Sequence, residues 1–314
     1  MTSEPLIVSG SPHLHSGAQS SRIMRDVLIA LIPAILGATI FFGPRALLVI
    51  LITVTSCVSS EYLIRRLWHR SNNLHDLTAV VTGTLLALNL PVSLPLWMAA
   101  LGGFIAIVIV KECFGGVGQN FVNPAITARI VLLMSFSSAM SVWNRPFSYL
   151  EHSDVVTSAS YFEALQSNLP LPSLGEMFLG IRSGSLGETS ALALLLGLIY
   201  LLYRRVITPL IPVVFVGTVG LLSWILGGDP LYQMMSGGLL LGAIFMATDY
   251  TTSPTTPLGQ GIFAFGCGLI TVLIRFYAAL PEGVSYAILL MNILTPLIDR
   301  FTIPRAFGSE RRRA

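Results

Sequence analysis

A glycine-rich segment, residues 115–125, leads into an apolar run and carries two candidate ligand-binding amides, Asn120 and Asn123. Pro124 follows directly, and proline is favoured at the first position of a helix, so the segment predicts a loop that runs into a helix. A loop of this kind exposes backbone N–H groups to an anion or another polar ligand. The alternative is that the glycines serve only close packing between helices.

Arg129 lies within the apolar run, one to two helical turns after Pro124. An arginine inside an apolar spanning helix is costly, so it is by default a functional candidate. It could neutralise a charged cofactor or a carboxylate on an ion path. The alternative is a buried ion pair with Asp249 or Glu282.

Asp249 is predicted at the C-terminal end of a helix, where a carboxylate is unfavourable against the helix dipole. Binding of a cation or of a ligand's donor group would explain it. Hydroxyl side chains that could add oxygen ligands follow or flank it: Thr248, Thr251, Thr252 and Ser253. The alternative is an ordinary solvated aspartate in a loop.

A fourth segment, Gly187, Glu188, Thr189 and Ser190, precedes an apolar run. Considered alone, these residues predict a helix start, with Thr189 or Ser190 as the N-cap and Glu188 at the positive helix end.

Neither a metal site nor a catalytic side chain is predicted. His13 and His15 lie two residues apart before the first apolar run, but no cysteine or carboxylate cluster joins them. The three cysteines, Cys57, Cys113 and Cys267, are too few and too far apart for a disulfide framework or a metal site.

The elements that position these residues follow from composition. Of 314 residues, 54% are hydrophobic and only 11% charged, with a mean hydropathy of +0.77. Soluble domains carry about 25% charged residues, so this chain has too few charges to cover a globule in water. A soluble enzyme, a disordered regulator and a disulfide scaffold are excluded. A multi-pass membrane protein of class all-α is predicted, with no nucleic-acid partner.

Ten apolar runs are predicted to cross a membrane as helices. They lie at 22–42, 44–64, 77–92, 96–112, 122–140, 189–204, 207–227, 232–249, 258–279 and 283–301. The long polar stretch 141–188 divides them into five before and five after.

The arginines and lysines predict the orientation. With a cytoplasmic N-terminus, thirteen fall on the cytoplasmic side, and four, Arg45, Arg145, Arg182 and Arg275, fall outside. Both termini are then cytoplasmic and the 141–188 loop is extracytoplasmic.

The two halves have features of weak inverted repeats. Residues 82–86 and 236–240 share a small-residue pattern, and each apolar stretch then stops early at polar residues and prolines. Paired interrupted segments in an inverted repeat point to a binding site at the repeat interface. The alternative is that small-residue patterns are common in any helix bundle.

Taken in order, several segments resemble the D subunit of the bacterial Rnf electron-transport complex and, less closely, the B subunit of the sodium-translocating NADH:quinone reductase. They are Ser11-Pro12-His13 to Gly17, Asn123-Pro124-Ala125, Gly187-Glu188-Thr189-Ser190, Ala247-Thr248-Asp249 to Pro254, and Leu290-Met291-Asn292 to Asp299-Arg300.

The resemblance implies a redox subunit of the bacterial inner membrane. Its complex would couple electron transfer between ferredoxin and NAD to Na⁺ or H⁺ movement. It implies FMN linked through its phosphate to the hydroxyl of Thr189, beside Gly187, Glu188 and Ser190, and leaves a second, non-covalent flavin open. Other membrane subunits are the expected partners, including an FMN-carrying G subunit on the outer side.

Asn120, Asn123, Arg129 and Asp249 are the further candidates for lining a flavin or coupling pathway. The expected organisation is a cytoplasmic segment 1–21, a first five-helix repeat 22–140, an outer loop 141–188, a second repeat 189–301 and a basic cytoplasmic tail 302–314. Two other functions stay open. A secondary transporter would bind a small solute between the repeats, and a structural subunit would only scaffold redox partners.

Overall fold

The computed structural model describes residues 20–70, 74–150, 165, 171–278 and 283–303. Within these ranges the chain is helical and contains no β-strand, which confirms the all-α class. Four helices are long and apolar enough to cross a membrane: α1 (Ser20–Phe42), α2 (Pro44–Leu67), α13 (Pro257–Tyr277) and α14 (Gly283–Thr302). These helices indicate a membrane protein.

Shorter apolar helices accompany them: α3 (Thr78–Leu88), α5 (Pro124–Ser135), α9 (Ala191–Tyr203) and α10 (Leu210–Ile225). Helix α4 (Leu96–Phe104) continues without a break into a π-helical stretch, η2 (Ile105–Glu112). The small elements are η1 (Leu74–Asp76), α6 (Ser137–Met140), η3 (Ser148–Leu150), α8 (Leu174–Leu179), α11 (Pro230–Met235), α12 (Leu239–Leu241) and the π-helical η4 (Gly242–Met246).

Side-chain caps mark where the site-forming helices begin. The Asn123 side chain accepts hydrogen bonds from the backbone N–H groups of Ala125 and Ile126, and Pro124 occupies the first turn of α5 as predicted. At the start of α9 the N-cap is Ser190, whose hydroxyl accepts from Ala193 N–H. Of the two capping residues proposed from the sequence, Ser190 is therefore the one used.

Three predicted spans are interrupted, of which two lie in the first half and one in the second. The run 77–92 is helical only to Leu88, and the non-helical stretch that follows contains Pro91 and Pro95. The run 122–140 is divided at Phe136 between α5 and α6. Proline removes a backbone donor and disfavours helix before it, which explains the early end of α3.

The prediction of one continuous span over 232–249 is wrong. The structure divides this run into α11, a turn, and the α12–η4 pair. Gly237 and Gly238 in the turn have φ of 62° and 67°, a left-handed conformation that glycine adopts freely and that ends a helix. Gly83 in the first half lies inside helix α3, so the two small-residue patterns have different backbone conformations.

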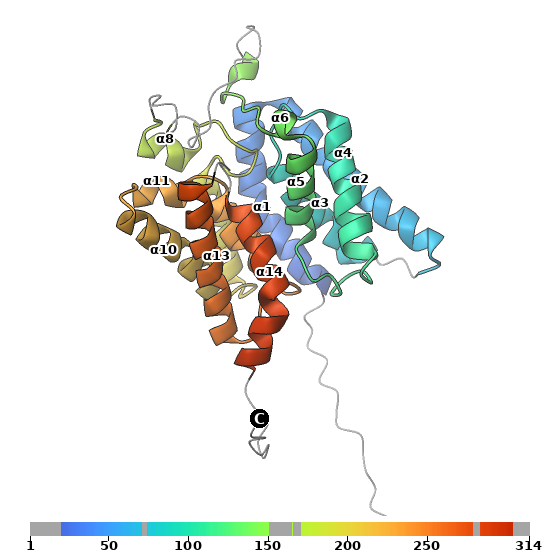
Figure 1. The fold of residues 1–314 in the computed structure, drawn as a ribbon. Coiled ribbons are helices and arrows are strands. Elements are labelled where there is room, and N and C mark those ends of the chain that lie inside the picture. The colour runs from blue at the N-terminus through green and yellow to red at the C-terminus, as the bar shows by residue number, and fades with distance from the viewer. Residues whose placement is uncertain (1–19, 71–73, 151–164, 166–170, 279–282, 304–314) are drawn as a thin grey trace, which may run out of the picture.

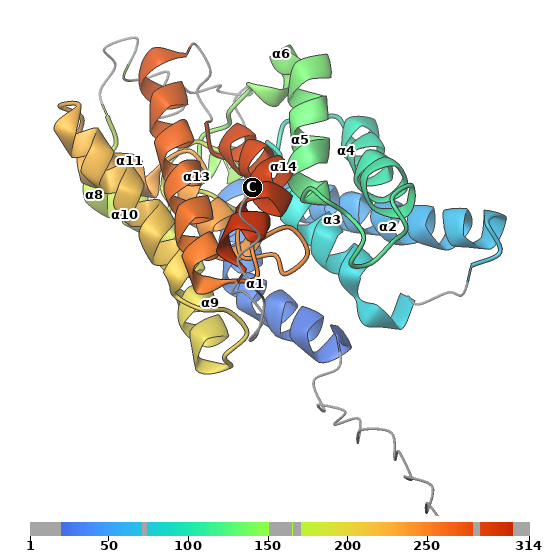
Figure 2. The ribbon, with the colours of Figure 1, turned by 60° about the horizontal axis from the view of Figure 1, so that its bottom comes forward.

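Figures 1 and 2 show the helices as one bundle. Helix α2 packs on α3 and α4, while α10 packs on η4 and α13. The halves meet where α1 packs on α9 and where α5 packs on α14.

The start of α1 and the end of α14 lie on one side of the molecule, the lower side of Figure 1. Helices α6 and α8 lie on the opposite, upper side. These faces are called the N-terminal side and the loop side below. Helix α9 runs from the loop side at Ser190 to the N-terminal side, where Arg204 pairs with Asp26 of α1 at 3.2 Å.

Candidate functional site

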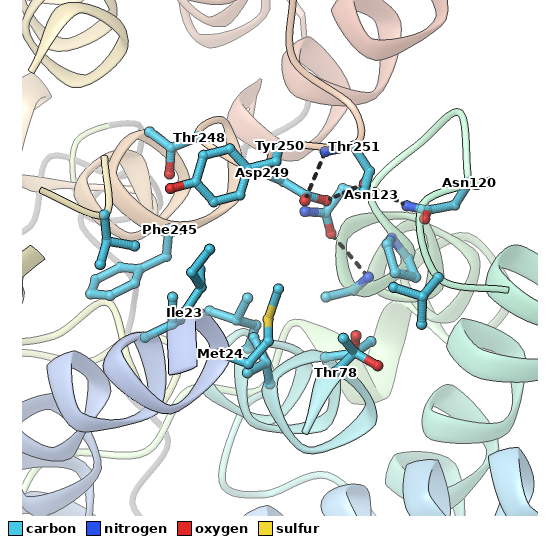
Figure 3. A pocket seen from close by; sticks show the side chains of 18 of the residues that line it. Ile23, Met24, Thr78, Asn120, Asn123, Phe245, Thr248, Asp249, Tyr250 and Thr251 are labelled. Atoms are coloured by element: carbon cyan, nitrogen blue, oxygen red, sulfur yellow. Dashed lines mark hydrogen bonds between the residues drawn. The ribbon is translucent and has the colours of Figure 1, made fainter. Parts of the chain in front are cut away.

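A cavity of about 110 Å³ opens between the halves toward the N-terminal side. Its walls are mostly apolar and come from the first turns of α1, the first half of α3, the start of α5, the end of α9 and the η4 segment. Figure 3 shows Ile23 and Met24 on one wall and Phe245 with Tyr250 on another. An apolar cavity with a few polar groups is the usual form of a small-ligand site.

Three residues predicted from the sequence, Asn120, Asn123 and Asp249, line this one cavity. The Asn120 amide donates to the Thr251 hydroxyl at 3.1 Å, which ties the glycine-rich loop to the loop after η4 (Figure 3). The Asn123 amide donates to the Met246 carbonyl at 3.3 Å. The structure thus brings residues as much as 131 positions apart in the sequence into one polar edge of an apolar cavity.

The carboxylate of Asp249 is used mainly within its own loop. One oxygen accepts from the Thr251 N–H at 3.3 Å, and the other accepts from the Thr251 hydroxyl at 3.1 Å and the Thr252 hydroxyl at 3.5 Å. Aspartate commonly closes turns by bonding to backbone two residues onward. This local role accounts for a carboxylate at a helix end without a bound cation.

Arg129 lies deeper than the cavity, where α5 meets α3 and α14. Its guanidinium donates to the Asn89 side chain at 3.1 Å and to the Ser285 hydroxyl at 3.0 Å. Asn89, at the broken end of α3, in turn lies 3.6 Å from the Met246 sulfur. Arg129 therefore joins the end of α3 to α14, and Asn89 joins the end of α3 to η4. Glu282, one of its two ion-pair partners proposed from the sequence, lies outside the described residues.

Gly187, Glu188, Thr189 and Ser190 form the second group of candidates. They lie in residues 182–190, called the attachment segment after the flavin linkage predicted from the sequence. Leu186 N–H donates to the Leu90 carbonyl at 3.1 Å, and Gly187 N–H donates to the Leu88 carbonyl at 2.7 Å. A Cβ at Gly187 would lie 2.5 Å from the Cβ of Leu88, so only glycine permits this approach. The segment is thereby fixed to the broken end of α3.

Within the attachment segment, Thr189 is 1% exposed and Glu188 is 7% exposed. The Glu188 carboxylate accepts from the Ser185 hydroxyl at 2.7 Å. A Cβ at Gly238 would lie 3.3 Å from that carboxylate and 3.9 Å from the Arg129 guanidinium. The predicted site residues therefore form two groups, one that lines the cavity and one in the attachment segment. Arg129 lies between these two groups.

Arg182 is a site residue that the sequence analysis did not single out. Its Nε donates to the Thr189 carbonyl at 3.2 Å, and its Nη2 donates to the carbonyls of Glu188 and Met235, each at 2.6 Å. Burial lowers the pKa of the Arg182 guanidinium, and the nearby negative charge of Glu188 opposes that shift. An arginine seven residues before Thr189 was the available sequence signal.

A buried ion cluster adjoins the cavity and was also missed. Lys111 donates to both oxygens of Glu61 at 3.1 Å and to the Thr78 hydroxyl at 2.7 Å. Arg65 bridges Glu61 at 2.9 Å and Glu112 at 3.0 Å. Lys111 and Thr78 also line the cavity. Glu61 within an apolar run was the sequence signal, because ionisable groups there are rare and usually paired.

The histidines considered for metal binding, His13 and His15, lie outside the described residues. Among the described residues, no group of three or more His, Cys, Asp or Glu side chains is arranged to hold a metal ion.

Comparison of the sequence with known proteins identifies related chains. A model of the NQR2, RnfD, RnfE family matches residues 7–308. The chain is 46% identical over 307 residues to the D subunit of the Na⁺-translocating ferredoxin:NAD⁺ oxidoreductase complex of Acetobacterium woodii, covering 96% of this chain and 95% of that protein. It is 44% identical over 322 residues to the D subunit of the proton-translocating ferredoxin:NAD⁺ oxidoreductase complex of Clostridium ljungdahlii, covering 97% and 96%. It is 36% identical over 345 residues to the D subunit of the ion-translocating oxidoreductase complex of Halorhodospira halophila, covering 97% and 96%.

Proposed function

This chain belongs to the NQR2, RnfD, RnfE family, and from that membership we propose that it is the D subunit of an ion-translocating ferredoxin:NAD⁺ oxidoreductase complex. It acts there as an integral membrane subunit, with the other subunits of the complex as partners. The relatives are named for Na⁺ in one organism and for protons in another, so the coupling ion varies among chains of this similarity.

We propose further that the subunit carries FMN, esterified through its phosphate to the Thr189 hydroxyl. The surrounding residues suit a phosphate: a buried guanidinium contacts the Thr189 carbonyl at 3.2 Å, and α9 begins two residues later. Positive charge and a helix N-terminus both favour phosphate binding. Because Thr189 is 1% exposed, the residues that cover it must move aside for the flavin ring.

When bound, FMN supplies one- and two-electron redox chemistry, while the protein supplies its attachment, orientation and electrostatic surroundings. The Gly187 contact with Leu88 holds the attachment segment against the first half, and Ser190 fixes where α9 begins. Together these contacts set the direction in which the Thr189 side chain leaves the backbone.

The cavity on the N-terminal side is our candidate for a second, non-covalent flavin. Its walls are apolar, and the amides of Asn120 and Asn123 lie at its polar edge. At about 110 Å³ the cavity is smaller than a flavin ring, so its walls must move apart to admit one. Asn89 and Arg129 lie between this cavity and the attachment segment. The arrangement supports a route for electrons that crosses the middle of the bundle.

The arrangement in two five-helix repeats, 22–140 and 189–301, is also a proposal. The matching packing of α2 on α3 and α4, and of α10 on η4 and α13, supports it. The cytoplasmic placement of both termini rests on the arginine and lysine distribution. With that orientation the loop side of the bundle faces outward, toward an FMN-carrying G subunit.

The position of Thr189, between the Arg182 guanidinium and the start of α9, is the observation that carries the flavin proposal. The test is in-gel flavin fluorescence of the full chain, purified from a host that has the flavin-attachment enzyme. We expect a fluorescent band for the wild type and none for Thr189→Ala. Thr208→Ala is the matched control, because Thr208 is exposed in the loop between α9 and α10 and its substitution should leave the band unchanged.

The rival functions predict other results. If the chain is a solute transporter or a purely structural subunit, the wild type should give no fluorescent band. That result would contradict the proposal that the subunit carries FMN. A band that persists in Thr189→Ala would remove only the assignment to Thr189.

A further inference from the structure

Arg182 is held by main-chain carbonyls. Its Nε and Nη2 donate to the carbonyls of Glu188, Thr189 and Met235, and its side chain is 5% exposed. Within the described residues, no carboxylate lies within ion-pair distance of this guanidinium. The Glu188 carboxylate, the nearest negative charge that acts on it, is instead bonded to the Ser185 hydroxyl.

A buried charge that has only neutral hydrogen-bond partners is costly. Carbonyl oxygens satisfy the guanidinium's donors, but they do not cancel its charge. An anion beside the guanidinium would cancel it. Nε and Nη2 of Arg182 already donate to the three carbonyls, so Nη1 is the group left to donate a charge-assisted hydrogen bond to a phosphate oxygen.

The position of such an anion follows from the contacts. Nε of Arg182 bonds to the carbonyl of Thr189, so a phosphate on the Thr189 hydroxyl would lie on the same residue that the guanidinium already contacts. A flavin phosphate esterified to threonine keeps one negative charge, which equals the single positive charge of Arg182. Arg182 also donates to the carbonyl of Met235, so its contacts reach α11 in the second half.

We propose that Arg182 is the counter-charge and positioning residue for the phosphodiester at Thr189. This inference rests on the proposed FMN attachment. The guanidinium holds the backbone of Glu188 and Thr189 in place and neutralises the phosphate once the flavin is attached. A residue that only clamps the backbone would need donors but no charge, so the two roles separate when charge and donors are varied independently.

The experiment measures covalent flavin per folded polypeptide in the purified full chain, from flavin absorbance and in-gel fluorescence. Arg182→Gln keeps an amide donor and removes the charge. Arg182→Lys keeps the charge and changes the geometry. We expect Arg182→Gln to lower the flavin content by roughly tenfold or more, and Arg182→Lys to stay within roughly threefold of the wild type. Arg145→Gln is the matched control, an exposed arginine on the loop side, and should carry the wild-type amount.

The outcomes separate the two proposals. A wild type without flavin ends the FMN proposal itself. With flavin present in the wild type, equal amounts in Arg182→Gln and the wild type would overturn the role of Arg182, as would an equal loss in the Gln and Lys variants. If Arg182→Gln does not accumulate in the membrane, the Lys variant decides: retained flavin supports the counter-charge, and tenfold loss overturns it.

Discussion

At the scale of residues, the stability of the protein depends on a buried cluster of charges, formed by Glu61, Arg65, Lys111 and Glu112. The side chains of Glu61 and Lys111 are 1% and 4% exposed, and their charged atoms lie 3.1 Å apart. Such pairs gain little over apolar packing, but removing one charged partner leaves the remaining buried charges unbalanced. Because Lys111 and Thr78 also line the cavity, the cluster links stability to the shape of the proposed flavin site.

We therefore expect Lys111→Met to destabilise the protein by about 3–5 kcal/mol, since Glu61 loses one of its two cations. The measurement is thermal unfolding in detergent, followed by the loss of monodisperse protein with temperature. Arg66→Met is the control, because Arg66 is exposed on the same helix as Glu61 and should shift the midpoint little. A melting temperature for Lys111→Met equal to that of the wild type would contradict this assignment.

Sequence reasoning at the residue scale succeeded where the cause was local. The start of α5 follows from Pro124, and the start of α9 from Ser190, one of the two caps considered, because such signals depend on neighbours in the chain. The cap formed by Asn123 was not predicted. Arg182 was missed because one of its acceptors is the carbonyl of Met235, 53 residues away. Backbone carbonyls leave no residue-type signal in a sequence, so only the fold shows that they converge.

Among the elements, the contact of α1 with α9 joins the two halves and is exceptionally close. A Cβ at Gly197 would lie 2.5 Å from the Ala30 carbonyl oxygen and 2.9 Å from the Phe245 ring. Small residues allow such approach between membrane helices, where backbone packing replaces the hydrophobic effect as the driving force. The same contact places Phe245 against the cavity wall.

Gly197→Ala should separate α1 from α9 and destabilise the protein by about 1–3 kcal/mol, the usual cost of overpacking. Gly217→Ala is its matched control in α10, where no atom lies within 4 Å of the added methyl group. That substitution should be neutral or stabilise by up to about 1 kcal/mol through helix propensity. Both are measured as shifts in thermal unfolding. Equal shifts for the two variants would show that the α1–α9 approach does not limit stability.

Continuous apolar runs were the elements best predicted from sequence. Helices α1 and α13 begin and end within two residues of the predicted runs 22–42 and 258–279. The run 232–249 was predicted poorly, because mean hydropathy does not register a turn made by Gly237 and Gly238. Hydropathy reports that a segment is apolar, whereas the backbone angles of glycine decide whether it stays helical.

For the whole molecule, the proposed orientation places the loop side outside the cell and the N-terminal side in the cytoplasm. Two positions report on it. Cys113 is the exposed native cysteine beside η2, while Cys57 and Cys267 are buried. Gly175 lies in α8 on the loop side, with no neighbour within 4 Å of an added side chain.

In intact cells, a membrane-impermeant maleimide should label Gly175→Cys and leave Cys113 unlabelled. After permeabilisation both cysteines should react, because the barrier to Cys113 is the membrane and not burial. The Gly175→Cys variant with Cys113→Ser isolates the engineered thiol. Labelling of Cys113 from outside, with protection of the α8 position, would invert the topology.

The attachment segment also has a consequence for biogenesis. Its carbonyl acceptors at Leu88 and Leu90 are synthesised well before Gly187, while the Met235 carbonyl is synthesised after it. Domains fold progressively from the N-terminus during synthesis. The threonine is therefore docked on the first half early, before α11 supplies the Met235 acceptor of Arg182, so the chain passes through a stage in which Thr189 is held in place while the contacts of Arg182 are still incomplete. An attachment enzyme that acts on the emerging chain would find its substrate in that interval.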